Sequence, residues 1–227
     1  MSMTKEMTSG KPYKLILSFA IPLILGNVFQ QLYNMVDTVI VGKFVGVNAL
    51  AGVGSTGAIN FLVIGFALGI CSGFSIMIAQ RFGAGDYSGM RKFIANSIYL
   101  CIAVAVILTA VTMLLTKPIL TVMNTPKEIY DYAYNYIIII FAGISATMFY
   151  NILSGILRAV GDSRTPLIFL GVSSVLNVGL DLLCIIVFKM GVAGAGIATV
   201  ISQAISAFLC LISVSYTHLT LPTKLEV

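Results

Sequence analysis

The stretch NVFQQLYNMVD, residues 27–37, decides the fold. It lies inside an otherwise apolar segment at residues 15–41, and its polar residues recur at intervals of three and four positions: Asn27, Gln30, Gln31, Asn34 and Asp37. At about 100° per residue they fall within roughly 120° of one helical face. In a helix that crosses a bilayer, such a stripe cannot face lipid, so we expect it to line a cavity or face other helices.

Asp37 is the acidic residue of this stripe and therefore the most costly one to place in a membrane. An aspartate at mid-membrane costs about 2.5–3.5 kcal/mol to insert. A partner, a proton or a bound cation must therefore compensate its charge. This makes Asp37 a candidate site residue.

The composition excludes an ordinary soluble domain. Mean hydropathy is +1.03, and 59% of residues are hydrophobic while only 9% are charged, against about a quarter charged in soluble proteins. The chain is predicted to be an all-α polytopic protein of the lipid bilayer. Its net charge of +5 reflects basic loops and gives no argument for a nucleic-acid partner.

No enzymatic, cofactor or transition-metal motif is found. The four cysteines stand singly in apolar segments, without the CxxC spacing of a metal or redox site. Phosphate loops, nucleophile elbows and zinc motifs are absent from the sequence. We therefore expect neither an enzyme nor a protein with a cofactor.

Six membrane-spanning helices are expected after a leader at residues 1–13. They are predicted at residues 14–42, 49–79, 93–115, 132–157, 167–188 and 192–212, so that residues 14–212 form one six-helix unit. Pro22 should kink the first helix, and Gly52, Gly54 and Gly57 should bend the second. Residues 117–131, with two prolines and mixed charge, are predicted to be a loop.

The loops on the two sides of the bundle contain different numbers of basic residues. Lysine and arginine are concentrated in the leader and in the loops around residues 81–92 and 158–164, and are fewer in the intervening loops. By the positive-inside rule, both termini of the six-helix unit are predicted to be cytoplasmic.

The C-terminal tail departs from the pattern before it. VSYTHLTLPT, residues 214–223, follows an apolar helix abruptly and resembles the translation of a sequencing adapter. Residues 213–227 are therefore expected to be non-native and are excluded from the fold prediction. The only histidine, His218, lies there and is not a candidate proton carrier.

Polar stripes also mark the later helices. Asp181 follows Asn177 and Ser173 at intervals of four residues, which places all three on one helical face. Asn151 lies in the fourth expected helix. The sixth carries Thr199, Ser202, Gln203 and Ser206. These inward stripes predict one shared polar interior.

Two carboxylates in such an interior suit two related tasks. If Asp37 and Asp181 approach one another without a cation, one of them becomes a usable proton acceptor. If Asn177 and Thr199 converge with them, the all-oxygen ligand set suits Na⁺. The spacing alone leaves both ions open.

Several segments together resemble the N-terminal half of a multidrug and toxic compound extrusion (MATE) transporter, across residues 12–212. They are AIPLILGNVFQQLYNMVDTVIVGKFVG (20–46), AQRFGAGD (79–86), LRAVGDSRTP (157–166), NVGLDLLCI (177–185) and GVAGAGIAT (191–199). The DinF-like branch of the family is the most similar. The resemblance implies a bacterial inner-membrane antiporter with two six-helix lobes, of which the C-terminal lobe is missing here.

The resemblance also implies an activity and a site. Such a transporter exports small organic, often cationic, compounds in exchange for H⁺ or Na⁺. The cation site would comprise Asp37, Asn177, Asp181 and Thr199, with Asn151 nearby, and the kink at Pro22 would respond to its occupancy. The remaining stripe residues would line the cavity: Asn27, Gln30, Gln31, Asn34 and Gln203.

Two alternatives remain open. A lipid-linked or polysaccharide flippase of related architecture would need a groove lined by arginine or lysine within the helices, and none is predicted. A membrane scaffold without transport activity would tolerate replacement of its interior acids.

Overall fold

The computed structural model describes residues 12–220, without the side chains at positions 12, 14, 15, 19 and 216–220. This part of the chain is helical. In order, the helices are α1 (Pro12–Phe44), α2 (Val47–Ser55), α3 (Gly57–Gly83), α4 (Tyr87–Val122), α5 (Lys127–Ala142), α6 (Ile144–Ala159), α7 (Arg164–Leu182), the π-helical turn η1 (Leu183–Val187) and α8 (Val192–Thr220). The predicted all-α class is confirmed.

The helices are long and apolar enough to make a multi-pass membrane protein. Five segments qualify as spans on their own: Ile16–Phe44, Gly57–Gly83, Tyr87–Val122, Arg164–Val187 and Val192–Ser215. The sixth is the pair α5 and α6, which is bent by 45° at its junction. Six spans result when this pair counts as one, which agrees with the sequence prediction.

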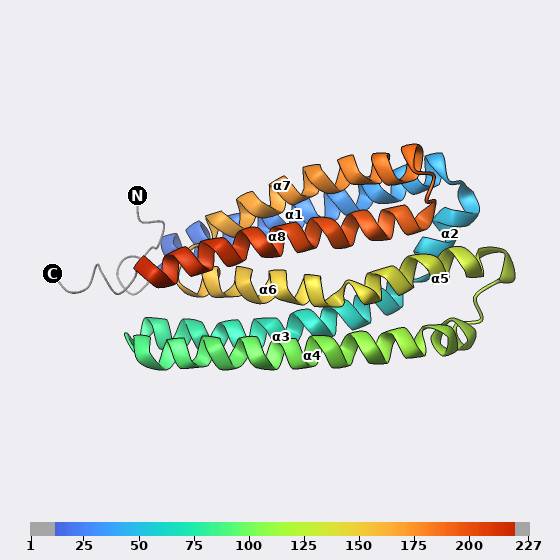
Figure 1. The fold of residues 1–227 in the computed structure, drawn as a ribbon. Helices are drawn as coiled ribbons and strands as arrows, with labels where there is room; N and C mark the ends of the chain where they lie inside the picture. Colours follow the sequence, from blue (N-terminus) through green and yellow to red (C-terminus); the bar gives the residue numbers. More distant parts are fainter. Residues whose placement is uncertain (1–11, 221–227) are drawn as a thin grey trace.

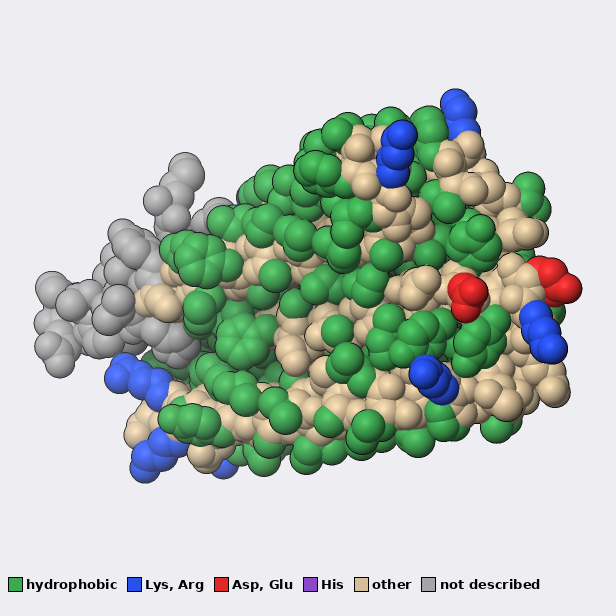
Figure 2. Space-filling view, turned by 45° about the vertical axis from the view of Figure 1, so that its right-hand side comes forward, with side chains coloured by type: hydrophobic (Ala, Val, Ile, Leu, Met, Phe, Trp, Pro, Cys, Tyr) green, Lys and Arg blue, Asp and Glu red, His purple; other side chains and the backbone are tan. Residues whose placement is uncertain are grey.

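The spans lie side by side in one bundle (Figure 1). Helix α6 contacts α3, α4 and α8, while α7 packs between α1 and α8. The start of α1, the end of α8, and the α3–α4 and α6–α7 turns lie at one end of the bundle. Figure 2 shows an apolar surface between charged side chains that lie toward the two ends of this face, as a lipid-facing surface requires.

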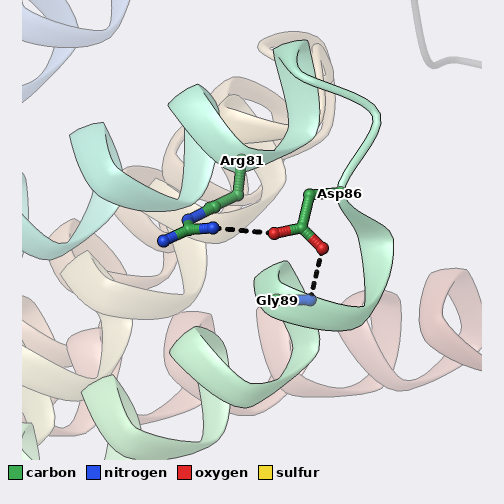
Figure 3. Close-up of polar contacts among 3 residues, drawn as sticks. All are labelled: Arg81, Asp86 and Gly89. Atoms are coloured by element: carbon green, nitrogen blue, oxygen red, sulfur yellow. Dashed lines mark hydrogen bonds and ion pairs between the residues drawn. The ribbon is translucent and has the colours of Figure 1, made fainter.

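The α3–α4 turn is fixed by one acidic side chain (Figure 3). Oδ1 of Asp86 accepts a 2.8 Å hydrogen bond from the Gly89 amide, and Oδ2 pairs with Nη1 of Arg81 at 2.8 Å. Gly85 precedes it with φ of +73°, a conformation that favours glycine. The Gly89 amide, and then Arg81, lower the pKa of Asp86 from its ordinary value, because both stabilise the charged form.

The predicted bend in the second span is a complete break. Helix α2 ends at Ser55 and α3 begins at Gly57. Gly52 is buried where α2 meets α5: a Cβ there would lie 2.7 Å from Cβ of Tyr132 and 3.0 Å from the backbone nitrogen of Ala133. The absence of a side chain at Gly52 therefore lets the two helices approach closely.

Two other boundaries were predicted wrongly. The segment 117–131 is not a long loop, because α4 continues through Pro118 to Val122 and α5 begins at Lys127. Leu120 is almost fully buried in this last part of α4, and this burial favours continuing the helix. The helix predicted at 132–157 is broken at Gly143, where a Cβ would overlap the side chain of Val200 on α8.

The last helix also extends beyond its predicted end at residue 212. Helix α8 continues to Thr220, and Val214 is buried against the core. The segment expected to be non-native thus begins within this helix. Residues 221–227 lie outside the described residues, as does the side chain of His218.

Candidate functional site

The two interior acids are brought together by helices that are distant in sequence. Asp37 comes from α1 and Asp181 from α7, and these two helices pack along one another. The side chain of Asp37 interacts with that of Asp181 and with that of Thr199 on α8. Three spans therefore supply one polar site.

Three of the four carboxyl oxygens of the acidic pair have no hydrogen-bond donor among the described residues. Asp181 is fully buried, and within the described part of the chain neither of its carboxyl oxygens accepts a hydrogen bond. The same is true of Oδ1 of Asp37. Two carboxylates cannot bond to each other, because each is only an acceptor. The pair is satisfied when one acid carries a proton or when a cation lies between them.

Asn177 and Thr199 extend the site by one turn. Nδ2 of Asn177 lies 3.5 Å from Oγ1 of Thr199, to which it donates, and the Thr199 hydroxyl donates to the carbonyl of Ala195 at 3.0 Å. Oδ1 of Asn177 is buried and has no donor among the described residues. The oxygen atoms of Asp37, Asp181 and Asn177 thus remain free to accept a proton or to bind a hard cation such as Na⁺.

A π-helical turn follows the site directly. The regular helix α7 ends at Leu182, one residue after Asp181, and η1 continues with a hydrogen bond from the Phe188 amide to the Leu183 carbonyl at 3.0 Å. Such turns are found in helices mostly at functional sites.

Two tyrosines adjoin the acids and were missed in the sequence. Tyr136 of α5 lies close enough to both Asp37 and Asp181 to interact with them electrostatically. Tyr33 of α1 is buried, and its hydroxyl accepts a hydrogen bond from Nε2 of Gln203 at 3.4 Å. Tyr136 is the last of four tyrosines at alternate positions in residues 130–136, so the sequence pattern does not single it out.

The polar stripe of α1 divides between two environments. Gln30 and Asp37 are half-buried, and Gln30 interacts with the hydroxyl of Tyr33. The other three residues of the stripe are exposed on the lobe: Asn27, Gln31 and Asn34. These three residues form an exposed polar edge of the bundle.

Asn151 lies in a different place from the acids. Its Nδ2 donates to the carbonyl of Thr147 at 2.8 Å, and its side chain lines a cavity of about 340 Å³ between α1, α3 and α6. Leu23 lines the same cavity and precedes Asp37 by fourteen residues on α1, or about 21 Å along the helix. The structure thus places Asn151 with the cavity rather than with the acidic pair.

The charged residue of this cavity is Arg158. The sequence prediction ended the fourth helix at residue 157 and assigned Arg158 to a loop, but α6 includes it and ends at Ala159. Arg158 lines the cavity together with Ser72, Ser75 and Asn151.

Helix α1 runs continuously through Pro22. The proposed response of a kink at Pro22 to occupancy of the cation site stays a prediction.

The bundle and its enclosed acids define a class of protein. A multi-pass membrane protein with ionisable residues buried between its spans is typical of ion-coupled membrane transporters. Comparison with known proteins gives the family: the MatE family matches residues 22–183. The chain belongs to the MATE family of multidrug efflux transporters.

Relatives and solved structures agree with this assignment. The probable multidrug resistance proteins YpnP and YoeA of Bacillus subtilis are 33% and 34% identical to the chain, over 88% and 92% of its length. A solved multidrug resistance MATE family transporter in an outward-facing conformation superposes with a TM-score of 0.86 at 29% identity, over 93% of this chain and 47% of its own. The chain spans about half the length of the curated relatives it matches, 45% and 46%.

Proposed function

We propose that this chain is the N-terminal lobe of a multidrug antiporter, in which H⁺ or Na⁺ binds at Asp37 and Asp181 and drives export of small organic compounds. The observation that carries the proposal is the pair formed by the buried Asp181 and the half-buried Asp37, in which three carboxyl oxygens have no hydrogen-bond donor among the described residues. A site that needs a cation to complete it can couple cation entry to a change of conformation. Asn177 and Thr199 supply the remaining oxygen ligands.

The missing partner in this proposal is a C-terminal six-helix lobe. The chain matches about half of its relatives, and the exposed polar edge formed by Asn27, Gln31 and Asn34 suits a cavity between two lobes. The proposal puts both termini of the six-helix unit on the cytoplasmic side of a bacterial inner membrane, as the positive-inside rule predicts. Membership of the DinF-like branch and the non-native origin of residues 213–227 stay predictions.

The test is efflux from proteoliposomes that contain the full-length transporter to which this lobe belongs. A pH gradient and a Na⁺ gradient are applied separately, and the gradient that drives efflux identifies the coupling ion. Asp37→Asn and Asp181→Asn should each reduce gradient-driven efflux to background. The matched control is Asp131→Asn, at an exposed acid near the start of α5.

Either outcome of this experiment decides the site. Wild-type efflux in Asp37→Asn or Asp181→Asn would overturn the assignment. If the wild-type protein itself showed no gradient-driven efflux, the scaffold alternative would be favoured instead. One observation favours the flippase alternative: Arg158, a cationic side chain on helix α6, lines the cavity. It is a single cation and does not form a charged groove, so multidrug export remains the proposed activity.

A further inference from the structure

Two buried thiols meet at one point outside the acidic site. Cys71 of α3 and Cys101 of α4 both direct their sulfur atoms at the carbonyl oxygen of Met148 on α6, at 3.7 and 4.0 Å. The two thiols also interact with each other. They are about 2% and 1% exposed. Three helices therefore enclose a pair of free cysteines.

The pair is distinct from the other two cysteines. Cys184 lies in η1 and Cys210 in α8, and all four are free thiols. The groups that act on Cys184 and Cys210 are charged or polar side chains rather than a second thiol. The chain thus provides two matched single cysteines for comparison.

The pair can be reached from the cavity. Cys71 is one of the side chains that line the cavity of about 340 Å³ between α1, α3 and α6, and Cys101 lies behind it against Met148. An engineered apolar cavity of about 150 Å³ binds benzene, so this cavity has room for a small aromatic reagent. A neutral ligand that enters meets Cys71 first.

We propose that Cys71 and Cys101 form a dithiol site that binds trivalent arsenicals. Thiolates prefer soft ligands, and two neighbouring thiols hold one soft centre as a chelate. An arsenical R–As=O reacts with both thiols: two S–As bonds form, and the oxygen leaves as water with the two thiol protons. No electron is transferred, so no oxidant is required. The product links α3 to α4 beside α6.

This site does not depend on the proposed transport activity. It requires only that the two thiols lie together in the folded lobe. The chelate should bind about 100-fold more tightly than a single thiol, because the second S–As bond forms at a high effective concentration. Removal of either cysteine should therefore weaken binding, whereas removal of Cys184 or Cys210 should not.

The test uses phenylarsine oxide on membranes that contain the 227-residue chain. Intact-mass measurement of the purified chain should show one phenylarsenic adduct, removed by 2,3-dimercaptopropanol but not by the same concentration of 2-mercaptoethanol. Cys71→Ala and Cys101→Ala should each lower the affinity about 100-fold. Cys184→Ala and Cys210→Ala should retain wild-type affinity. Wild-type affinity in Cys71→Ala or Cys101→Ala, or no adduct on the wild-type chain, would overturn the proposal.

A second measurement needs no variant and so does not depend on the folding of a mutant. Peptide mapping of the wild-type adduct should find arsenic linking the peptide that contains Cys71 to the one that contains Cys101. Arsenic between any other pair of cysteines would show that the site is not the one proposed.

Discussion

The carboxyl group of Asp181 on α7 faces that of Asp37 on α1, and neither oxygen of Asp181 accepts a hydrogen bond from the described residues. Two helices that are distant in sequence thus meet through two carboxylates, each of which can only accept hydrogen bonds. Burial without a donor costs roughly 1–3 kcal/mol for a polar group and more for a charged one. The lobe carries this cost at the place where the proposed function needs a cation.

Removal of the Asp181 charge should stabilise the lobe while it abolishes coupling. In Asp181→Asn, the new amide can donate to Asp37, so we expect the free energy of unfolding to rise by about 1–3 kcal/mol. Thermal unfolding in detergent without added Na⁺ measures this change. Asp131→Asn is the control, and should change stability by less than about 0.5 kcal/mol. A lower Tm in Asp181→Asn would contradict the prediction.

The hydroxyl of Thr199 should contribute to cation affinity. Thr199→Val removes the oxygen that accepts from Asn177 and lies within reach of Asp37. Loss of one such ligand should raise the half-saturating concentration of the coupling ion about tenfold, which corresponds to roughly 1.4 kcal/mol. Efflux as a function of Na⁺ or pH measures it. Thr38→Val is the matched control, since Thr38 is exposed and bonds its own helix at Asn34. An equal effect in both variants would argue against a ligand role for Thr199.

Close packing of α2 against α5 should make Gly52 intolerant of a side chain. In Gly52→Ala the new Cβ would lie 3.0 Å from a backbone nitrogen of α5, which cannot move alone. We expect a loss of about 1–3 kcal/mol in unfolding free energy. Gly54→Ala is the control, because a Cβ there meets nothing within 4 Å and alanine favours the helix. Equal Tm values for the two variants would refute this account of the helix contact.

Much of the fold and part of the site could be predicted from the sequence. Apolar runs located the spans because each must cross the bilayer, and helical periodicity placed Asp37, Asn177 and Asp181 on inward faces because lipid excludes them. In the structure Asp37 interacts with Asp181 and Thr199, and Asn177 donates to Thr199, while their role as a cation site stays a prediction. Local patterns were sufficient here because the membrane constrains every residue of a span in the same way.

The remaining features depend on contacts between distant segments. The break at Gly143 follows from the approach of Val200 on α8, which no pattern around Gly143 reveals. Tyr136 reaches the acids only because α5 packs against α2 and α8. Asn151 has the same residue type as Asn177 but faces the cavity. Residue type alone could not distinguish the two positions.

Asp86 should make the α3–α4 turn sensitive to acid. Its pKa is lowered in the folded lobe by the Gly89 amide and by Arg81, so its stabilising contribution is present above the unfolded pKa, ordinarily about 3.9. The contribution is lost as pH falls through the lower folded pKa. The Tm difference between the wild type and Asp86→Ala should therefore be constant from pH 7 to 5 and shrink below pH 4. Arg81→Gln should give a smaller difference that shrinks over the same range. A Tm difference between the wild type and Asp86→Ala that grows as the pH falls would contradict a lowered pKa of Asp86.

Arg158 should set the charge preference of the cavity. Among the described residues that line the cavity, it is the basic one and none is acidic. A carboxylate or phosphate on a substrate can pair with its guanidinium, whereas a cationic substrate is repelled. In the full-length transporter, Arg158→Gln should therefore reduce efflux of anionic and zwitterionic substrates about tenfold, corresponding to loss of a charge-assisted hydrogen bond of roughly 1.5 kcal/mol, and leave cationic ones unchanged or improved. Arg164→Gln is the control, because Arg164 is exposed at the start of α7. Equal losses for substrates of both charges would instead indicate that Arg158 supports the end of α6.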